Sequence, residues 1–227
     1  VKNGKIADFR YKLLPVFANL LPADKDMQAL IDKARAPYLS KLNEKLAVSE
    51  GLLYRRGNFN GTFDQVILDA LMKVKDAEIA FSPGFRWGTS LLPGQPILME
   101  NVLDQTAITY PWTTVSNLSG EMIKTILEDV CDNLFNPDPY YQQGGDMVRV
   151  AGLGFELKAN AAMGSRITKL VHWPDGEPIE ASRRYSVAGW ASVKENIQGP
   201  AIYDVLEKFL REQGHVNIEP NTALRLV

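Results

Sequence analysis

The sequence has little cysteine, little histidine and no long apolar run. Its one cysteine, Cys131, excludes an internal disulfide, and its expected position on a helix favours a small buried side chain over a nucleophile. His172 and His215 are the only histidines and lack the spacing of a metal site. No apolar stretch approaches the roughly 20 residues of a membrane helix, so we expect no membrane partner. A P-loop, a Gly-x-Ser-x-Gly elbow and a dinucleotide fingerprint are also missing, which argues against a complete catalytic apparatus in this chain.

Charge of one sign is not concentrated anywhere along the chain. The 25 basic and 27 acidic residues are interspersed and give a net charge of −2, so the sequence shows no electrostatic footprint for nucleic acid. The 227 residues are 45% hydrophobic, which is ample for a buried core. Because the chain opens on Val1 with strand-like sequence, we expect a processed or truncated part of a larger protein.

The first 50 residues predict a tail and a connector. Residues 8–17 are rich in strand-forming side chains, and we assign residues 1–22 to the end of a preceding domain. Apolar positions recur at helical spacing over residues 24–48, and Pro37 is expected to bend that helix. We therefore expect a linker helix over residues 23–50 and a main domain over residues 51–227.

The main domain alternates strand-like and helix-like segments, which predicts an α/β fold (α+β, with a mixed sheet). A capping box at Thr62-Phe63-Asp64-Gln65 and a cap at Ser119 mark two helix starts, and Gly214 ends a third helix that begins near residue 200. The last internal strands are expected to be successive antiparallel neighbours. The predicted strands are 52–56, 77–81, 107–117, 155–159, 167–173, 184–189 and 224–227.

The segment Phe81-Ser82-Pro83-Gly84-Phe85-Arg86-Trp87-Gly88 is the first candidate site. It places one arginine in a Gly/Pro turn at the carboxyl end of a predicted strand, where ligands commonly bind. The guanidinium of Arg86 offers a fork of donors suited to a tetrahedral oxyanion, and Trp87 could wall the site. The alternative is an ordinary surface arginine. Asp64 is expected to cap its helix or face solvent rather than act in catalysis.

The second candidate site is the polar, aromatic run from Tyr140 to Val150. Its tyrosines and amides offer hydrogen-bonding groups, and its glycine pair allows close backbone approach; a tight turn with packed tyrosines is an equal alternative. Strand alternation puts Met147 and Arg149 on one face, so Arg149 either reaches the same anion or pairs with Asp146. The candidate residues in this run are Tyr140, Tyr141, Gln142, Gly144, Gly145, Asp146, Met147 and Arg149.

The order of these segments resembles the C-terminal domain of the 5′-nucleotidase family. The resemblance covers roughly residues 52–227 and rests on Phe81-Ser82-Pro83-Gly84-Phe85-Arg86, Thr109-Tyr110-Pro111-Trp112 and Gly144-Gly145-Asp146-Met147-Val148-Arg149-Val150. More narrowly, residues 81–94, 105–111 and 132–150 resemble the thiosulfohydrolases of the bacterial Sox sulfur-oxidation system, a branch of that superfamily.

The sequence departs from true nucleotidases at two places. They usually carry Asn-Gly-Gly-x-Ile-Arg at the arginine turn, of which only the glycine and Arg86 remain here. They also stack a base between two aromatic rings, whereas here Met147 falls near the first place and Trp190 near the second. These departures favour a smaller anion over a nucleotide.

The resemblance implies a larger enzyme of which this chain is the substrate-binding part. A preceding metallophosphatase-like domain would hold two manganese ions, whereas this chain would hold no metal of its own. The substrate would be a sulfonate linked through sulfur to a cysteine of a Sox carrier protein, hydrolysed to release sulfate in the periplasm. Two alternatives remain open: a nucleotidase or phosphodiesterase domain, and a non-catalytic module that binds a carrier peptide.

Overall fold

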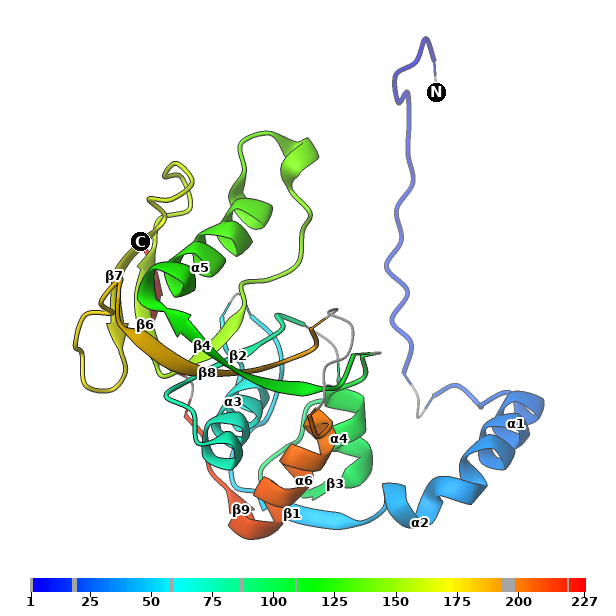
Figure 1. Cartoon of the computed structure of the whole chain (residues 1–227). Helices are drawn as coiled ribbons and strands as arrows, with labels where there is room; N and C mark the ends of the chain where they lie inside the picture. The colour runs from blue at the N-terminus through cyan, green and yellow to red at the C-terminus, as the bar shows by residue number, and fades with distance from the viewer. Residues whose placement is uncertain are drawn as a thin grey trace. The chain divides into compact units, whose positions relative to one another are not determined.

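The computed structural model describes residues 2–17, 20–57, 59–85, 88–108, 110–192, 199–219 and 221–227. The chain divides into two compact units, Val1–Ser40 and Lys41–Val227 (Figure 1). None of the helices in the described ranges is both long and apolar enough to cross a membrane.

The longest helix in the described part of the first unit is α1 (Lys25–Arg35), whose first turn is capped by Asp24. Oδ1 of Asp24 accepts a hydrogen bond of 2.8 Å from the Met27 amide. The predicted bend at Pro37 is confirmed, because α1 gives way there to the 3-10 turn η1 (Ala36–Tyr38). The predicted strand over residues 8–17 is wrong: these residues are exposed and form no strand, since strand-forming side chains alone cannot replace a pairing partner.

The predicted linker helix ends earlier than expected. A short helix, α2 (Leu39–Leu42), is its last turn, and the residues that follow form the strand β1 (Lys45–Ser49). β1 pairs antiparallel with β3 (Pro96–Leu98) and parallel with β9 (His215–Val216). Because this pairing buries Leu46 and its neighbour, tertiary contacts override the helical spacing of the apolar residues.

A mixed four-stranded sheet forms the centre of the second unit, in the order β4-β8-β2-β5. Its strands are β4 (Thr113–Ser119), β8 (Arg184–Trp190), β2 (Ile79–Ser82) and β5 (Arg149–Ala151). β2 and β8 are parallel, whereas β4 pairs antiparallel with β8 and β5 antiparallel with β2. This arrangement confirms the predicted α/β class with a mixed sheet.

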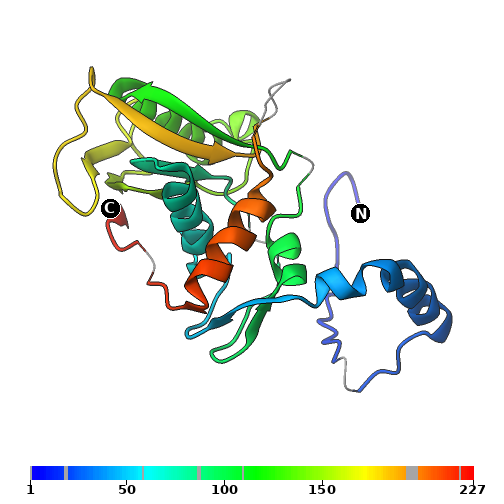
Figure 2. The same ribbon diagram turned by 60° about the horizontal axis from the view of Figure 1, so that its bottom comes forward.

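Both faces of this sheet are covered, so its strands divide their side chains between two apolar cores. In β2, Ile79 belongs to one core and Ala80 to the other, and Val187 and Ala188 of β8 divide in the same way. The first core contains side chains of α3 (Thr62–Lys75), α4 (Met99–Gln105) and α6 (Ile202–Gln213). Figure 2 shows α3 and α6 side by side on that face.

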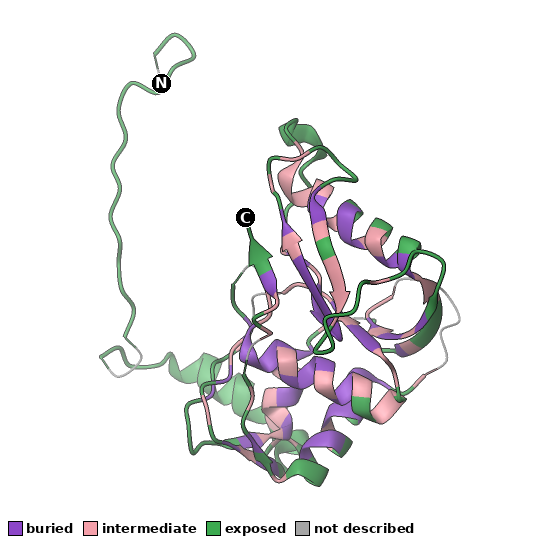
Figure 3. Ribbon diagram, turned by 90° about the vertical axis from the view of Figure 1, so that its left-hand side faces the viewer, coloured by how far each residue is buried: buried purple, intermediate pink, exposed green. Residues whose placement is uncertain are grey.

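The second core lies between the sheet, the helix α5 (Gly120–Phe135) and a further three-stranded sheet, β10-β6-β7. These strands are β6 (Leu153–Leu157), β7 (Ile167–His172) and β10 (Leu224–Leu226). Figure 3 shows the buried residues concentrated in the strands and on the inward sides of the helices.

The predicted helix ends at Ser119 and Gly214 are confirmed, and in the third case a neighbouring residue is the cap. Ser119 caps α5 and accepts a hydrogen bond of 3.2 Å from Met122 N, and α6 ends at Gly214, whose φ is +68°. In α3 the cap is Gly61 rather than Thr62: the Gly61 amide donates to Asp64 Oδ2 at 2.9 Å. Asp64 therefore does cap its helix, as the sequence predicts.

Three strand predictions need correction. Residues 52–56 form only an isolated bridge, between Leu53 and Leu91. The strand expected over residues 107–117 begins at Thr113, after Pro111, which has no amide to donate to a ladder. β7 pairs antiparallel with β6, as predicted, but β8 lies in the other sheet, because its alternating side chains fill both buried faces of that sheet.

Candidate functional site

The two candidate segments lie side by side at one edge of the central sheet. β2 and β5 are antiparallel neighbours with Ser82 opposite Arg149, so the loop that leaves β2 starts beside the loop that enters β5. At Gly84 the two backbones approach so closely that a Cβ atom would lie 2.4 Å from Met147 O. Arg86 and Trp87 lie outside the described residues.

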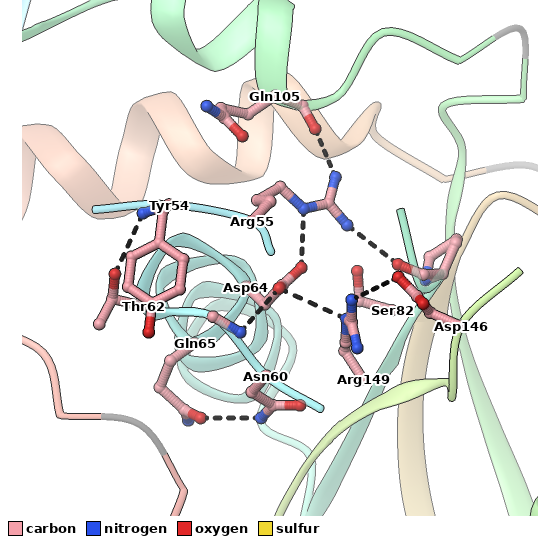
Figure 4. A network of polar contacts seen from close by, with 12 residues as sticks. Tyr54, Arg55, Asn60, Thr62, Asp64, Gln65, Ser82, Gln105, Asp146 and Arg149 are labelled. Atoms are coloured by element: carbon pink, nitrogen blue, oxygen red, sulfur yellow. Dashed lines mark hydrogen bonds and ion pairs between the residues drawn. The ribbon is translucent and has the colours of Figure 1, made fainter. Parts of the chain in front are cut away.

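A buried arginine that the sequence analysis did not consider, Arg55, holds the start of the first loop. Its Nη2 donates to Pro83 O at 2.9 Å, its Nη1 donates to Gln105 O, and its Nε bonds Asp64 Oδ1 at 2.7 Å (Figure 4). The side chains of Arg55 and Asp64 are fully buried. The one signal in the sequence was an arginine at the end of the short apolar run Leu52-Leu53-Tyr54, nine residues before the capping carboxylate.

The far end of the first loop is held by the end of α4. Thr89 N donates to Asp104 Oδ2 at 2.9 Å, and Gln105 Nε2 donates to Thr89 O at 2.7 Å. Because Gln105 also accepts a hydrogen bond from Arg55 through its carbonyl, both ends of the loop are fastened to one set of buried polar groups.

Arg149 holds the second loop in the same way. Its Nη2 bonds Asp146 Oδ2 at 3.0 Å and Gly57 O at 2.9 Å, and its Nε lies 3.4 Å from Asp64 Oδ2. Of the two roles that the sequence left open for Arg149, the structure shows the pairing with Asp146. Burial lowers the pKa of Arg149, and the nearby carboxylates of Asp64 and Asp146 partly oppose that shift.

Asp64 is therefore the residue that both arginines share. One oxygen faces Arg55, and the other accepts from the Gly61 amide and faces Arg149 (Figure 4). Its place in the first turn of α3 also suits a negative charge, since helix N-termini carry a partial positive charge.

The tyrosine-rich part of the second loop faces outward. Tyr140 and Tyr141 are 96% and 65% exposed, in the short turn η2 (Pro139–Tyr141). Gln142 is exposed too, and its Nε2 donates to Asn136 O at 2.7 Å. Gly144 and Gly145 have φ angles of +78° and +93° with open space around them, so the backbone conformation alone favours glycine there.

Met147 and Trp190 are buried in different cores. The predicted shared face of Met147 and Arg149 is wrong, because the strand starts only at Arg149 and Met147 packs in the same core as Val150. Trp190 packs in the other core, and its Nε1 donates to Ser82 Oγ at 2.8 Å. Their burial on opposite faces of the sheet offers no stacking sandwich in this structure.

An apolar cavity of about 440 Å³ lies beside Gly145. Gly145, Asp146 and Met147 form part of its wall, together with Phe59, Leu134, Phe135, Leu157 and Leu226.

The described residues contain no group of three or more His, Cys, Asp or Glu side chains that could hold a metal ion. Cys131 is buried, and burial raises the pKa of its thiol to about 12, with the nearby Glu128 carboxylate adding to the shift. It is therefore a neutral side chain that packs in the core, as the sequence predicts.

Comparison with known proteins identifies the family. The family model described as the C-terminal domain of 5′-nucleotidase matches residues 47–208. The chain belongs to this family. No curated protein sequence matches it at a significant level.

Solved structures with the same fold include three that are named as hydrolytic enzymes. The sulfate thiohydrolase SoxB of Thermus thermophilus shares 37% identity over 97% of this chain, with a TM-score of 0.89. A 5′-nucleotidase precursor from the same organism shares 16% identity over 92% of the chain (TM-score 0.73), and the NAD nucleotidase of Haemophilus influenzae shares 16% over 90% (TM-score 0.63). At 16% identity the two nucleotidases show the fold alone.

The chain spans 42–44% of the length of these three solved proteins. It is thus the C-terminal domain of a SoxB-like protein of the 5′-nucleotidase family, a family of hydrolases.

Proposed function

We propose that this chain is the substrate-binding part of a thiosulfohydrolase, which hydrolyses a cysteine-linked S-sulfonate on a carrier protein and releases sulfate during thiosulfate oxidation. The observation that carries the proposal is the adjacency of the two candidate loops at one sheet edge, in a chain that is 37% identical to a sulfate thiohydrolase. The two nucleotidases match less than half as well in sequence.

In this proposal the first loop binds the sulfonate and the second loop binds the carrier's peptide. Arg86 follows Phe85 in the first loop and would pair with the sulfonate oxygens through its guanidinium fork. The exposed Tyr140 and Tyr141, with the backbone at Gly144 and Gly145, would contact the carrier's peptide. The buried Arg149 and Asp146 would support this loop rather than touch the substrate.

The reaction breaks the sulfur–sulfur bond of the carrier conjugate. The oxygen of water adds to the sulfonate sulfur, and the sulfur that stays on the carrier leaves as a thiolate. One proton of the water goes to that thiolate and the other to solvent, and sulfate carries the new oxygen. Two manganese ions in a preceding metallophosphatase-like domain would supply the activated hydroxide when bound. The same proposal makes the protein periplasmic, with the Sox carrier protein and that metal domain as its partners.

The nucleotidase alternative has less support from this structure. The base sandwich of the nucleotidases needs two facing aromatic rings, whereas the side chains at the corresponding places, Met147 and Trp190, are buried in separate cores.

The test is sulfate release from a thiosulfonate-charged carrier by the full-length, metal-loaded protein. In the Arg86→Ala variant we expect kcat/KM to fall about 10²- to 10³-fold, the usual result of removing a charged donor at a reacting anion. Arg225→Ala is the matched control, because Arg225 is an exposed arginine of β10. Unchanged kinetics in Arg86→Ala would exclude that residue from the anion site, and turnover of a nucleotide without sulfate release would favour the nucleotidase. Carrier binding without any turnover would favour the peptide-binding module.

A further inference from the structure

The two candidate loops share one buried carboxylate. Arg55 contacts the first loop at Pro83 O, Arg149 contacts the second loop at Asp146, and Asp64 lies between the two guanidinium groups (Figure 4). Among the described residues, the Arg55 side chain has no hydrogen bond or ion pair with the second loop, and the Arg149 side chain has none with the first. Any displacement of Asp64 therefore acts on both loops together.

We infer that Asp64 is a positioning residue that couples the two loops through Arg55 and Arg149. The inference depends on the proposed function only for its consequence in catalysis, since the coupling itself is a property of the fold. Asp64 touches no substrate: its side chain is fully buried, and its role is to keep two cations at fixed positions behind the loops.

The geometry explains why a carboxylate shared by two arginines can link the two loops. The loops begin where the β2–β5 ladder ends, and the described residues show no backbone hydrogen bond between them beyond Ser82 and Arg149. The guanidinium of Arg55 reaches three elements at once: the first loop, the end of α4 and the first turn of α3. A planar fork with several donors can make such contacts simultaneously, whereas a lysine cannot.

The contact of Asp64 with Arg149, on the side of the second loop, is looser than its contact with Arg55. Nε of Arg149 lies 3.4 Å from Asp64 Oδ2, and neither Nε nor Nη1 of Arg149 has a hydrogen-bond partner among the described residues. The Arg55–Asp64 contact is shorter, at 2.7 Å. Asp64 is thus held more tightly to the first loop than to the second, so we expect changes at Arg55 to be transmitted more strongly than changes at Arg149.

Hydrogen exchange in the full-length protein tests the coupling without any substrate. In Arg55→Lys, peptides over residues 79–91 should exchange about tenfold faster or more, because contacts of a charged donor with Pro83 and Gln105 are lost. Exchange in peptides over residues 144–151 should also become faster, by about twofold or more, because the two loops are energetically coupled. Arg149→Lys should show the reverse pattern, with a smaller effect on the first loop.

Asp64→Asn in combination with these changes completes the test. Asp64→Asn alone should speed exchange in both loops, and in that background Arg55→Lys should no longer affect residues 144–151. If Asp64→Asn does not fold, the opposite-loop responses of Arg55→Lys and Arg149→Lys decide the matter. An opposite loop that stays at the wild-type rate in both variants would overturn the inference.

Glu128→Gln is the matched control, because it removes the charge of another buried carboxylate, which binds the amides of Gly164, Arg166 and Ile167. It should change exchange near those residues and leave both loops unchanged. If it speeds exchange in the loops as much as Asp64→Asn does, the effect is general loss of stability and the inference fails.

An activity arm separates this inference from the proposed function. Sulfate release by Arg55→Lys should fall about tenfold to hundredfold through misplacement of the first loop, while Glu128→Gln stays near wild type. If the wild-type protein releases no sulfate, the proposed function is wrong. The hydrogen-exchange rates still test the coupling between the loops, because they need no substrate.

Discussion

Two clusters of buried arginines and carboxylates join different elements of the second unit, and they differ in their access to water. The loop cluster consists of Arg55, Asp64, Asp146 and Arg149, whose side chains are at most 2% exposed. The α5 cluster consists of Glu128, Asp132 and Arg166, and the side chain of Asp132 is 21% exposed. The loop cluster contains equal numbers of opposite charges, as burial away from water requires.

The two clusters also differ in what they fasten. In the α5 cluster, Glu128 accepts hydrogen bonds from three backbone amides and closes the connection between β6 and β7. Its contacts hold one hairpin to one helix. The loop cluster joins five places in the chain, at residues 55–57, 64, 83, 105 and 146–149, and two of these belong to the candidate substrate loops. The comparison teaches that similar residues serve local closure in one region and the relative placement of distant loops in the other.

The largest effect is expected from Arg149→Met, which removes one cation of the loop cluster. Asp64 and Asp146 would then lose a partner inside the protein, and breaking a buried ion pair in this way typically costs about 3–5 kcal/mol. Urea denaturation followed by tryptophan fluorescence measures the loss in the free energy of unfolding. A loss below about 1 kcal/mol would mean that this cluster is as tolerant as a surface pair.

Arg166→Gln makes the corresponding change in the α5 cluster. We expect a smaller loss, about 1.5–3 kcal/mol, because water can still reach Asp132 when its partner is removed. Sulfate release by the full-length protein should stay within about twofold of wild type, because within the described ranges Arg166 bonds Asp132 and Phe135 and has no hydrogen bond to Pro83 or Asp146. If this variant lost as much activity as Arg55→Lys, the claim that only the loop cluster positions the candidate loops would be wrong.

Gly84→Ala tests the close approach of the two loops directly. The added Cβ would lie 2.4 Å from Met147 O and 2.9 Å from Asp146 Cβ, so one backbone must move. Overpacking of this kind typically costs about 1–3 kcal/mol, and we expect a loss of sulfate release to accompany it. Gly189→Ala is the control, because a Cβ there would meet only atoms at 3.8 Å or more. If thermal denaturation showed the same decrease in Tm for both variants, the close contact between the two loops at Gly84 would not be important for stability.

The smallest effect concerns Cys131, whose Sγ lies 3.6 Å from Met147 Sδ and whose thiol lies near the α5 cluster. Because its pKa is raised from 9.0 to about 12 in the folded protein, alkylation by iodoacetamide at pH 8 should be negligible until the protein unfolds. The same shift means that the thiol's contribution to stability is full below about pH 9 and declines as the pH rises towards 12. Rapid alkylation of the native protein, read by mass spectrometry, would contradict the burial of this side chain.

Particular residues show how far sequence reasoning reached. Ser119, Asp64 and Gly214 mark helix ends by local chemistry, so those ends were predictable. The strand β1 was not, because its apolar residues also fit a helix and only its pairing with β3 and β9 decides between the two. Met147 illustrates a similar limit, since its side chain follows the core rather than the alternation of the strand that comes after it.

The sequence by itself determined the class of fold, the two loop segments and the inert character of Cys131. These follow from hydrophobic periodicity, turn residues and the chemistry of single side chains, all of which act over a few residues. Only the tertiary structure decided that Arg55, Asp64, Asp146 and Arg149 form one network. Arg55 and Arg149 are far apart in sequence, and their ion pairs with Asp64 exist only because folding brings three elements together and excludes water from between them.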